Sequence, residues 1–140
     1  MKKAISNMDN RNCRQKGIDR LKEIGDTSPI FDDLEAVAPQ MVDYIYEFAF
    51  GSVHNRDGLS VRDRELVIIS ALAAKGDVLP ELKNHIHTGL VAGLSPREIS
   101  EALCQLVVYC GFPESIAALR AMKEVFDAEH VDYSDLHKKQ

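Results

Sequence analysis

The sequence predicts an all-α protein, a compact bundle of about six or seven helices. Three observations support this class. Apolar residues recur every three or four positions in successive segments, which is the spacing that lines one face of a helix. Serine, proline and glycine separate these segments at the positions where helices start and stop. No stretch alternates apolar and polar residues for long enough to predict a β-strand.

The first half of the chain predicts a polar helix and a longer interrupted one. Residues 12–24 carry isoleucine and leucine at helical spacing and end at a glycine, and they are otherwise so polar that we expect a peripheral helix. Residues 28–51 continue with an apolar face, and Pro39 restarts or kinks this segment. Residues 52–59 read as a polar loop.

Two later helices are predicted to be apolar on nearly every side. Ser60 with Asp63 forms a capping-box pattern before residues 61–76, and Ser95 with Glu98 does the same before a helix that ends at Cys110. A helix that is apolar all round lies in the centre of a protein or at a subunit interface. Because one small core does not need two such helices, we expect a homo-oligomer.

A helix over residues 80–93 lies between those two and carries the candidate chemistry. At 100° per residue, His85 falls on the flank of its apolar face, and Glu81 lies one turn earlier, where its carboxylate can touch the imidazole. His87 points almost the opposite way, toward Lys83 and water. Since His85 and His87 are about 200° apart, they cannot close on one ion with Glu81, and we expect no metal.

The last long helix is predicted from Pro113, and the polar residues from His130 onward are expected to fray. The predicted domain organisation is therefore an N-terminal extension with its peripheral helix over residues 1–26, a helical domain over 27–130, and a polar tail over 131–140.

Composition limits the partners and the compartment. The chain has 140 residues, with 22 acidic and 17 basic side chains, so its net charge of -5 argues against nucleic-acid binding, although a local Arg pair could still hold a small anion. No apolar run approaches the ~20 residues of a membrane span, and the N-terminus is too polar for a signal peptide. We therefore expect a soluble cytoplasmic protein with no membrane partner.

The three cysteines are expected to be reduced. Their number is odd, no CxxC occurs, and Cys104 and Cys110 lie in an apolar run where we expect buried thiols. These two residues are six positions apart, about 240° around an intact helix, so a disulfide between them is geometrically implausible.

Several motifs, in order over residues 32–126, together resemble the carboxymuconolactone decarboxylase family. They are Arg62-Asp63-Arg64-Glu65-Leu66, Glu81-Leu82-Lys83-Asn84-His85, Gly93-Leu94-Ser95, Glu98-Ile99 and Tyr109-Cys110-Gly111-Phe112-Pro113. The resemblance implies an all-α fold, a small-molecule substrate, no cofactor, assembly as trimers or hexamers, and a role in aromatic-compound catabolism.

The same resemblance separates two branches of the family. The redox branch, which resembles the alkylhydroperoxidase D-type proteins, carries a CxxC pair before the histidine that matches His85. Here Val78 and Glu81 stand in place of that pair, so we expect no thiol peroxidase activity. A glutamate four residues before the histidine is the pattern of the decarboxylase branch.

The resemblance also assigns candidate roles. His85 is expected to transfer a proton and Glu81 to support it, although periodicity alone favours a core-facing histidine with a structural role. Glu65 is either a third catalytic residue or a first-turn carboxylate that complements the helix dipole. Arg64 and Arg62 are either surface charges or the cations that bind a substrate carboxylate.

Two functions remain open from the sequence. The first is a cofactor-free decarboxylase acting on 4-carboxymuconolactone or a related small lactone acid. The second is a non-catalytic oligomeric module of the same fold that binds small acids.

Overall fold

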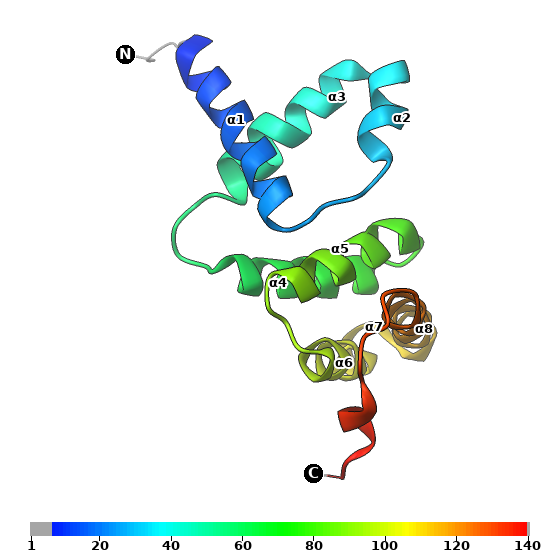
Figure 1. Cartoon of the computed structure of the whole chain (residues 1–140). Coiled ribbons are helices and arrows are strands. Elements are labelled where there is room, and N and C mark those ends of the chain that lie inside the picture. The colour runs from blue at the N-terminus through cyan, green and yellow to red at the C-terminus, as the bar shows by residue number, and fades with distance from the viewer. Residues whose placement is uncertain (1–6, 140) are drawn as a thin grey trace. The chain divides into compact units, whose positions relative to one another are not determined.

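The computed structural model describes residues 7–139 and confirms the all-α class, because no strand occurs in this range. Eight α-helices, one π-helix and one 3-10 helix make up the described chain (Figure 1). In order they are α1 (Asn7–Glu23), α2 (Ile30–Val37), α3 (Pro39–Tyr44), η1 (Ile45–Val53), α4 (Val61–Lys75), α5 (Leu79–Val91), α6 (Pro96–Gln105), α7 (Val107–Cys110), α8 (Phe112–Ala128) and η2 (Ser134–His137).

The chain divides into two compact units, one up to Leu59 and the other from Ser60. In the first unit, α1 crosses the π-helix η1 with their backbones in direct contact. A Cβ atom at Gly17 would lie 1.9 Å from the carbonyl oxygen of Tyr46, and one at Gly51 would lie 2.0 Å from that of Cys13. Only glycine permits this approach. Arg20 then ties the two helices together by donating to the backbone oxygen of His54 at 3.2 Å.

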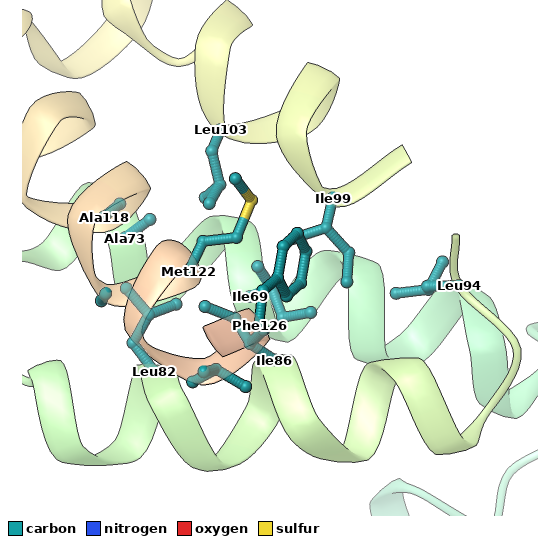
Figure 2. Packing of buried hydrophobic residues seen from close by; sticks show 12 residues of the cluster. Ile69, Ala73, Leu82, Ile86, Leu94, Ile99, Leu103, Ala118, Met122 and Phe126 are labelled. Atoms are coloured by element: carbon teal, nitrogen blue, oxygen red, sulfur yellow. The ribbon is translucent and has the colours of Figure 1, made fainter. Parts of the chain in front are cut away.

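The second unit holds the larger hydrophobic core and the candidate site. Helices α4 and α5 lie side by side, and α6 and α8 cross them (Figure 1). The ring of Phe126 from α8 lies among aliphatic side chains of the three other helices, as Figure 2 shows. The buried residues that contribute most to this core are Ile69, Leu82, Ile86, Ile99, Leu103, Met122 and Phe126. Burying each of them fully is worth about 1.5–3 kcal/mol.

Both predicted serine-capped helix starts in this unit are confirmed. The side chain of Ser60 accepts a hydrogen bond from the backbone N–H of Asp63 at 3.0 Å. Ser95 and Glu98 form a complete capping box at the start of α6. Glu98 also pairs with Arg62. The backbone N–H of Ser95, and after it Arg62, hold the pKa of Glu98 below its ordinary value, because both stabilise the charged carboxylate.

In the second unit, the structure departs from the sequence expectation in two elements. The predicted single helix up to Cys110 is divided at Leu106 into α6 and α7. The segment expected to fray instead folds back, since η2 forms and Val131, Tyr133 and Leu136 pack against the core. The three predicted domain boundaries stay a prediction.

The cysteine environment also differs from the expectation. Cys104 is exposed, and Cys13 and Cys110 are half-buried, so the prediction of buried thiols at positions 104 and 110 was wrong. The physical reason lies in α6, where Ile99, Ala102 and Leu103 form the buried face and Cys104 falls outside it. Among the described residues, no helix is both long enough and apolar enough to cross a membrane.

Candidate functional site

Helix α5 presents His85 at the edge of the core. Pro80 lies in the first turn of this helix, where its missing N–H costs nothing. Leu82 and Ile86 are buried, and they anchor the helix on either side of the histidine. The side chain of His85 is 16% exposed, so it lies on the flank of the buried face as the periodicity predicted.

The partner of His85 comes from the neighbouring helix. Glu65 in α4 is fully buried, and its Oε2 atom lies 2.9 Å from Nδ1 of His85. A buried carboxylate is costly unless hydrogen bonds and a nearby cation compensate for its lost hydration. The pair therefore has the geometry of a carboxylate that orients a histidine, because an Nδ1–H group donating to Glu65 leaves Nε2 as the outward nitrogen.

A small residue on α5 permits this contact. A Cβ atom at Gly89 would lie 2.9 Å from Cδ1 of Ile69 and 3.0 Å from Cδ1 of Leu94. It would also lie 3.8 Å from Cβ of Glu65. Gly89 thus lets α4 approach α5 closely enough for a carboxylate on one helix to reach an imidazole on the other.

A further residue, Thr88, belongs to the same cluster, and sequence reasoning missed it. Its side chain is fully buried, and Oγ1 donates to Oε2 of Glu65 at 2.8 Å. The only sequence signal for this role is a threonine three residues after the histidine. Such a signal is weak, because a threonine within a helix commonly donates to a carbonyl group of its own helix.

Glu81 does not make the contact that its spacing suggested. Its side chain is exposed, and among residues 7–139 it forms no hydrogen bond or ion pair with His85. The flank of α5 that carries His85 faces α4, where Glu65 already occupies Nδ1. His87 also differs from the expectation, since its Nδ1 lies 2.6 Å from Oε1 of Glu129, beyond the end of α8.

The two arginines of the predicted site are in different surroundings. Arg62 forms ion pairs with Glu98 and, at 3.4 Å, with Asp63, and both residues belong to the same unit. Arg64 is half-buried and directly precedes Glu65 in α4. Of the predicted site residues, the structure therefore brings together His85 and Glu65, and it leaves Glu81 exposed and Arg62 paired to its neighbours.

A cavity of about 260 Å³ lies between the end of α4 and the starts of α5 and α8. Apolar side chains, among them Leu72, Leu79 and Leu82, line it together with Lys75 and Glu114, and His85 does not. Within residues 7–139, no three His, Cys, Asp or Glu side chains lie close enough together to hold a metal ion.

Comparison with known proteins gives one family. Residues 39–124 match the model of the carboxymuconolactone decarboxylase family. An uncharacterised 15.0 kDa protein of Paracoccus denitrificans is 31% identical over 97 residues, which cover 69% of this chain and 72% of that protein.

Two relatives named as decarboxylases are also similar. The 4-carboxymuconolactone decarboxylase of Acinetobacter baylyi is 36% identical over 83 residues, covering 59% of this chain and 61% of the relative. The nitrosuccinic acid decarboxylase of Metarhizium robertsii is 35% identical over 75 residues, covering 54% and 52% respectively. The matches thus span less than two thirds of the length of either decarboxylase.

Proposed function

The chain belongs to the carboxymuconolactone decarboxylase family, and from this premise we propose that it is a carboxy-lyase acting on a small carboxylic acid. The names of two relatives support loss of CO₂ as the reaction, on a lactone acid in one and on nitrosuccinic acid in the other. The observation that carries the proposal is the buried Glu65 carboxylate on Nδ1 of His85. This contact leaves Nε2 to act on a substrate.

The reaction needs an electron acceptor and a proton. When the bond from carbon to carboxylate breaks, CO₂ leaves and the electron pair stays on the substrate, where a conjugated carbonyl such as that of an unsaturated lactone can hold it as a dienolate. Nε2–H of the His85 imidazolium then gives its proton to carbon, and a C–H bond forms. The imidazole takes up a proton from water before the next turnover.

Glu65 contributes to this step through its charge. The carboxylate keeps the Nδ1 proton of His85 directed at Oε2, so the proton that the ring can release is the one on Nε2. Proton delivery of this kind typically accelerates a reaction 10²–10⁴-fold, or about 3–5 kcal/mol of barrier.

The cation that binds the substrate carboxylate is proposed to be Arg64. It directly precedes Glu65 in α4, and its planar guanidinium matches a carboxylate in two-point geometry. The supporting role predicted for Glu81 stays a prediction. Its side chain is exposed and is not part of the pair that Glu65 forms with His85.

A panel of small acids tests this proposal. Purified protein is mixed with 4-carboxymuconolactone, related lactone acids and nitrosuccinate, and CO₂ release is measured together with ligand affinity by calorimetry. We expect catalytic CO₂ release from at least one acid with a conjugated electron acceptor. Binding without turnover for every acid would contradict the proposal and favour the non-catalytic small-acid module.

A further inference from the structure

The cavity between the end of α4 and the starts of α5 and α8 has an apolar wall. Ala73, Leu82 and Ala118 in this wall are buried and belong to the hydrophobic core. Leu79 and Ala117 extend the wall toward the surface. The volume of the cavity is about 260 Å³, whereas an apolar cavity of about 150 Å³ is large enough to bind benzene. The cavity therefore has room for one ring with a short chain.

Three charged side chains, Lys75, Asp77 and Glu114, also line the cavity. Lys75 and Asp77 are exposed and opposite in sign, so water screens them and their effects largely offset each other. Glu114 is half-buried. Among the residues that the structure describes, its side chain forms no hydrogen bond or ion pair. The carboxylate of Glu114 therefore determines which charge the cavity favours.

Two glycine turns fix the place of the Glu114 side chain. Gly76, which ends α4, and Gly111, which precedes α8, have positive φ angles of 68° and 87°. A Cβ atom at Gly76 would lie 3.7 Å from Cγ of Glu114, and one at Gly111 would lie 3.8 Å from its Oε2 atom. The side chain of Glu114 therefore lies between the two turns, at the edge of the cavity.

The helix starts at the cavity do not form a site for an anion. Helices α5 and α8 begin here, and each has a proline and a glutamate in its first turn. Proline has no N–H group to donate, and glutamate offsets the positive end of the helix dipole. An anion would therefore meet the carboxylate of Glu114 and fewer backbone donors than a helix start usually offers.

We propose that this cavity binds a small organic cation, a primary amine whose apolar body is about the size of a benzene ring with a short chain. The ammonium group donates to the carboxylate of Glu114, and the apolar body packs against Leu82 and Ala118. An apolar wall with a few polar groups is typical of small-molecule sites. Since neither Glu65 nor His85 lines the cavity, the proposal is independent of the proposed carboxy-lyase reaction.

The test measures the binding of three probes with the same apolar body and different charges to the full-length protein at neutral pH. Phenethylamine is the cation, phenethyl alcohol is the neutral compound, and hydrocinnamate is the anion. Affinities come from NMR titrations of the alanine methyl groups, which include Ala117 and Ala118 in the cavity wall. We expect the amine to bind at least about fivefold more tightly than the alcohol, and hydrocinnamate to bind most weakly.

Three variants separate the role of charge from that of shape. Glu114→Gln removes the charge and keeps the size of the side chain, so we expect the amine and the alcohol to bind within about twofold of each other. Glu101→Gln makes the same change at an exposed position of α6 outside the cavity and should bind all three probes as the native protein does. Ala117→Leu fills part of the cavity and should weaken the amine and the alcohol alike, by at least about fivefold.

Each outcome supports or overturns the proposal. A native protein that binds no probe at millimolar concentration would overturn it, and so would equal affinity for the amine and the alcohol. Preferred binding of hydrocinnamate, or shifts confined to alanines outside the cavity, would overturn it as well. If Ala117→Leu does not fold, Glu114→Gln against Glu101→Gln decides alone. Failure of the acid panel to release CO₂ leaves these outcomes unchanged, because amine binding requires no turnover.

Discussion

A carboxylate that is fully buried, as Glu65 is, has lost its hydration and depends on hydrogen bonds and nearby charges in the protein. Glu65→Gln keeps the shape of the side chain and an oxygen that can accept from His85 and Thr88, so we expect the fold to persist. The negative charge is lost, however, and a neutral carboxamide is a weaker acceptor for the ring N–H of His85 than a carboxylate is. We expect kcat for the acid identified by the panel to fall at least about 10²-fold.

Glu81→Gln is the matched control for that variant, since it makes the same chemical change on α5, the helix that carries His85. Because Glu81 is exposed and forms no hydrogen bond or ion pair with His85, we expect a change in kcat of less than about tenfold. Steady-state kinetics that gave the large loss to Glu81→Gln and the small one to Glu65→Gln would make Glu81 the supporting carboxylate.

The sequence predicted that His85 lies on the flank of the buried face of α5. Side-chain directions repeat regularly along a helix, so the face of each residue follows from its position. The sequence could not choose between Glu81 and Glu65. The i, i+4 spacing makes Glu81 a local candidate, whereas the contact with Glu65 depends on the register of α4 against α5. That register is set by packing at Ile69, Gly89 and Leu94, which no single-helix pattern contains.

At the scale of elements, the α4–α5 contact depends on Gly89. Gly89→Ala places a methyl group 2.9 Å from Cδ1 of Ile69 and 3.0 Å from Cδ1 of Leu94, inside a packed core. We expect this overpacking to lower the free energy of unfolding by about 1–3 kcal/mol in urea denaturation. Adding Ile69→Val removes one of the two opposing atoms and should recover part of the loss.

An exposed position on the same helix controls for helix propensity. Val91→Ala changes a side chain that is 49% exposed, and we expect an effect within about 0.5 kcal/mol. Equal stability of Gly89→Ala and the native protein would show that α4 and α5 are not held at this distance.

The C-terminal segment gives a pH dependence. Lys123 first, and Tyr133 after it, donate hydrogen bonds to Asp127 and hold its pKa below the ordinary value of 3.8. Since the pKa is lowered in the folded state, the ionised carboxylate stabilises this segment above pH 3.8, and its contribution is lost as the pH falls through the folded value. We expect amide protection factors over residues 131–137 to fall between neutral pH and about pH 3.

Asp127→Asn is the control, because an amide does not titrate in this range. Protection in this variant should start lower, since the bond with Tyr133 at 2.7 Å and the ion pair with Lys123 lose their charge. It should then change less with pH. An unchanged pH response in Asp127→Asn would contradict the assignment.

Features decided by neighbouring residues in the sequence could be predicted, whereas features decided by packing between distant segments could not. The serine caps at positions 60 and 95 were correct because a cap is decided within four residues. The π-helix η1 was not predicted, since its widened turn at Gly51 is associated with the crossing of α1. The packing of Tyr133 and Leu136 was missed because polar neighbours outnumber them in the tail.

For the whole molecule, the exposed apolar side chains lead to a prediction about assembly. In the second unit, Val108 and Tyr109 on α7 are 76% and 81% exposed, and Phe112 at the start of α8 is 70% exposed. Contiguous apolar surface of this kind is unfavourable in water. We expect sedimentation to give a species well above the 15.6 kDa of one chain.

Val108→Lys tests whether this surface is the interface. A charge at a position this exposed should leave the folded chain intact and shift the protein toward the monomer. Gln105→Lys adds the same charge at an exposed position of α6 and should not. A native protein that sediments as a monomer at micromolar concentration would contradict the prediction, and so would a Val108→Lys protein that assembles like the native one.

The central claim is that His85 delivers the proton that follows loss of CO₂, and replacing it tests this most directly. In His85→Asn, the amide nitrogen can still donate to Glu65, so the buried carboxylate keeps a partner while Nε2 disappears. In His85→Ala, a space is left that free imidazole can enter. Circular dichroism establishes that both variants are folded.

The measurement is the rate of CO₂ release from the acid that the native protein turns over best. We predict a fall of about 10²–10⁴-fold in both variants, with partial recovery of His85→Ala, and not of His85→Asn, on addition of imidazole. Native rates of CO₂ release from folded His85→Asn and His85→Ala proteins would contradict the claim.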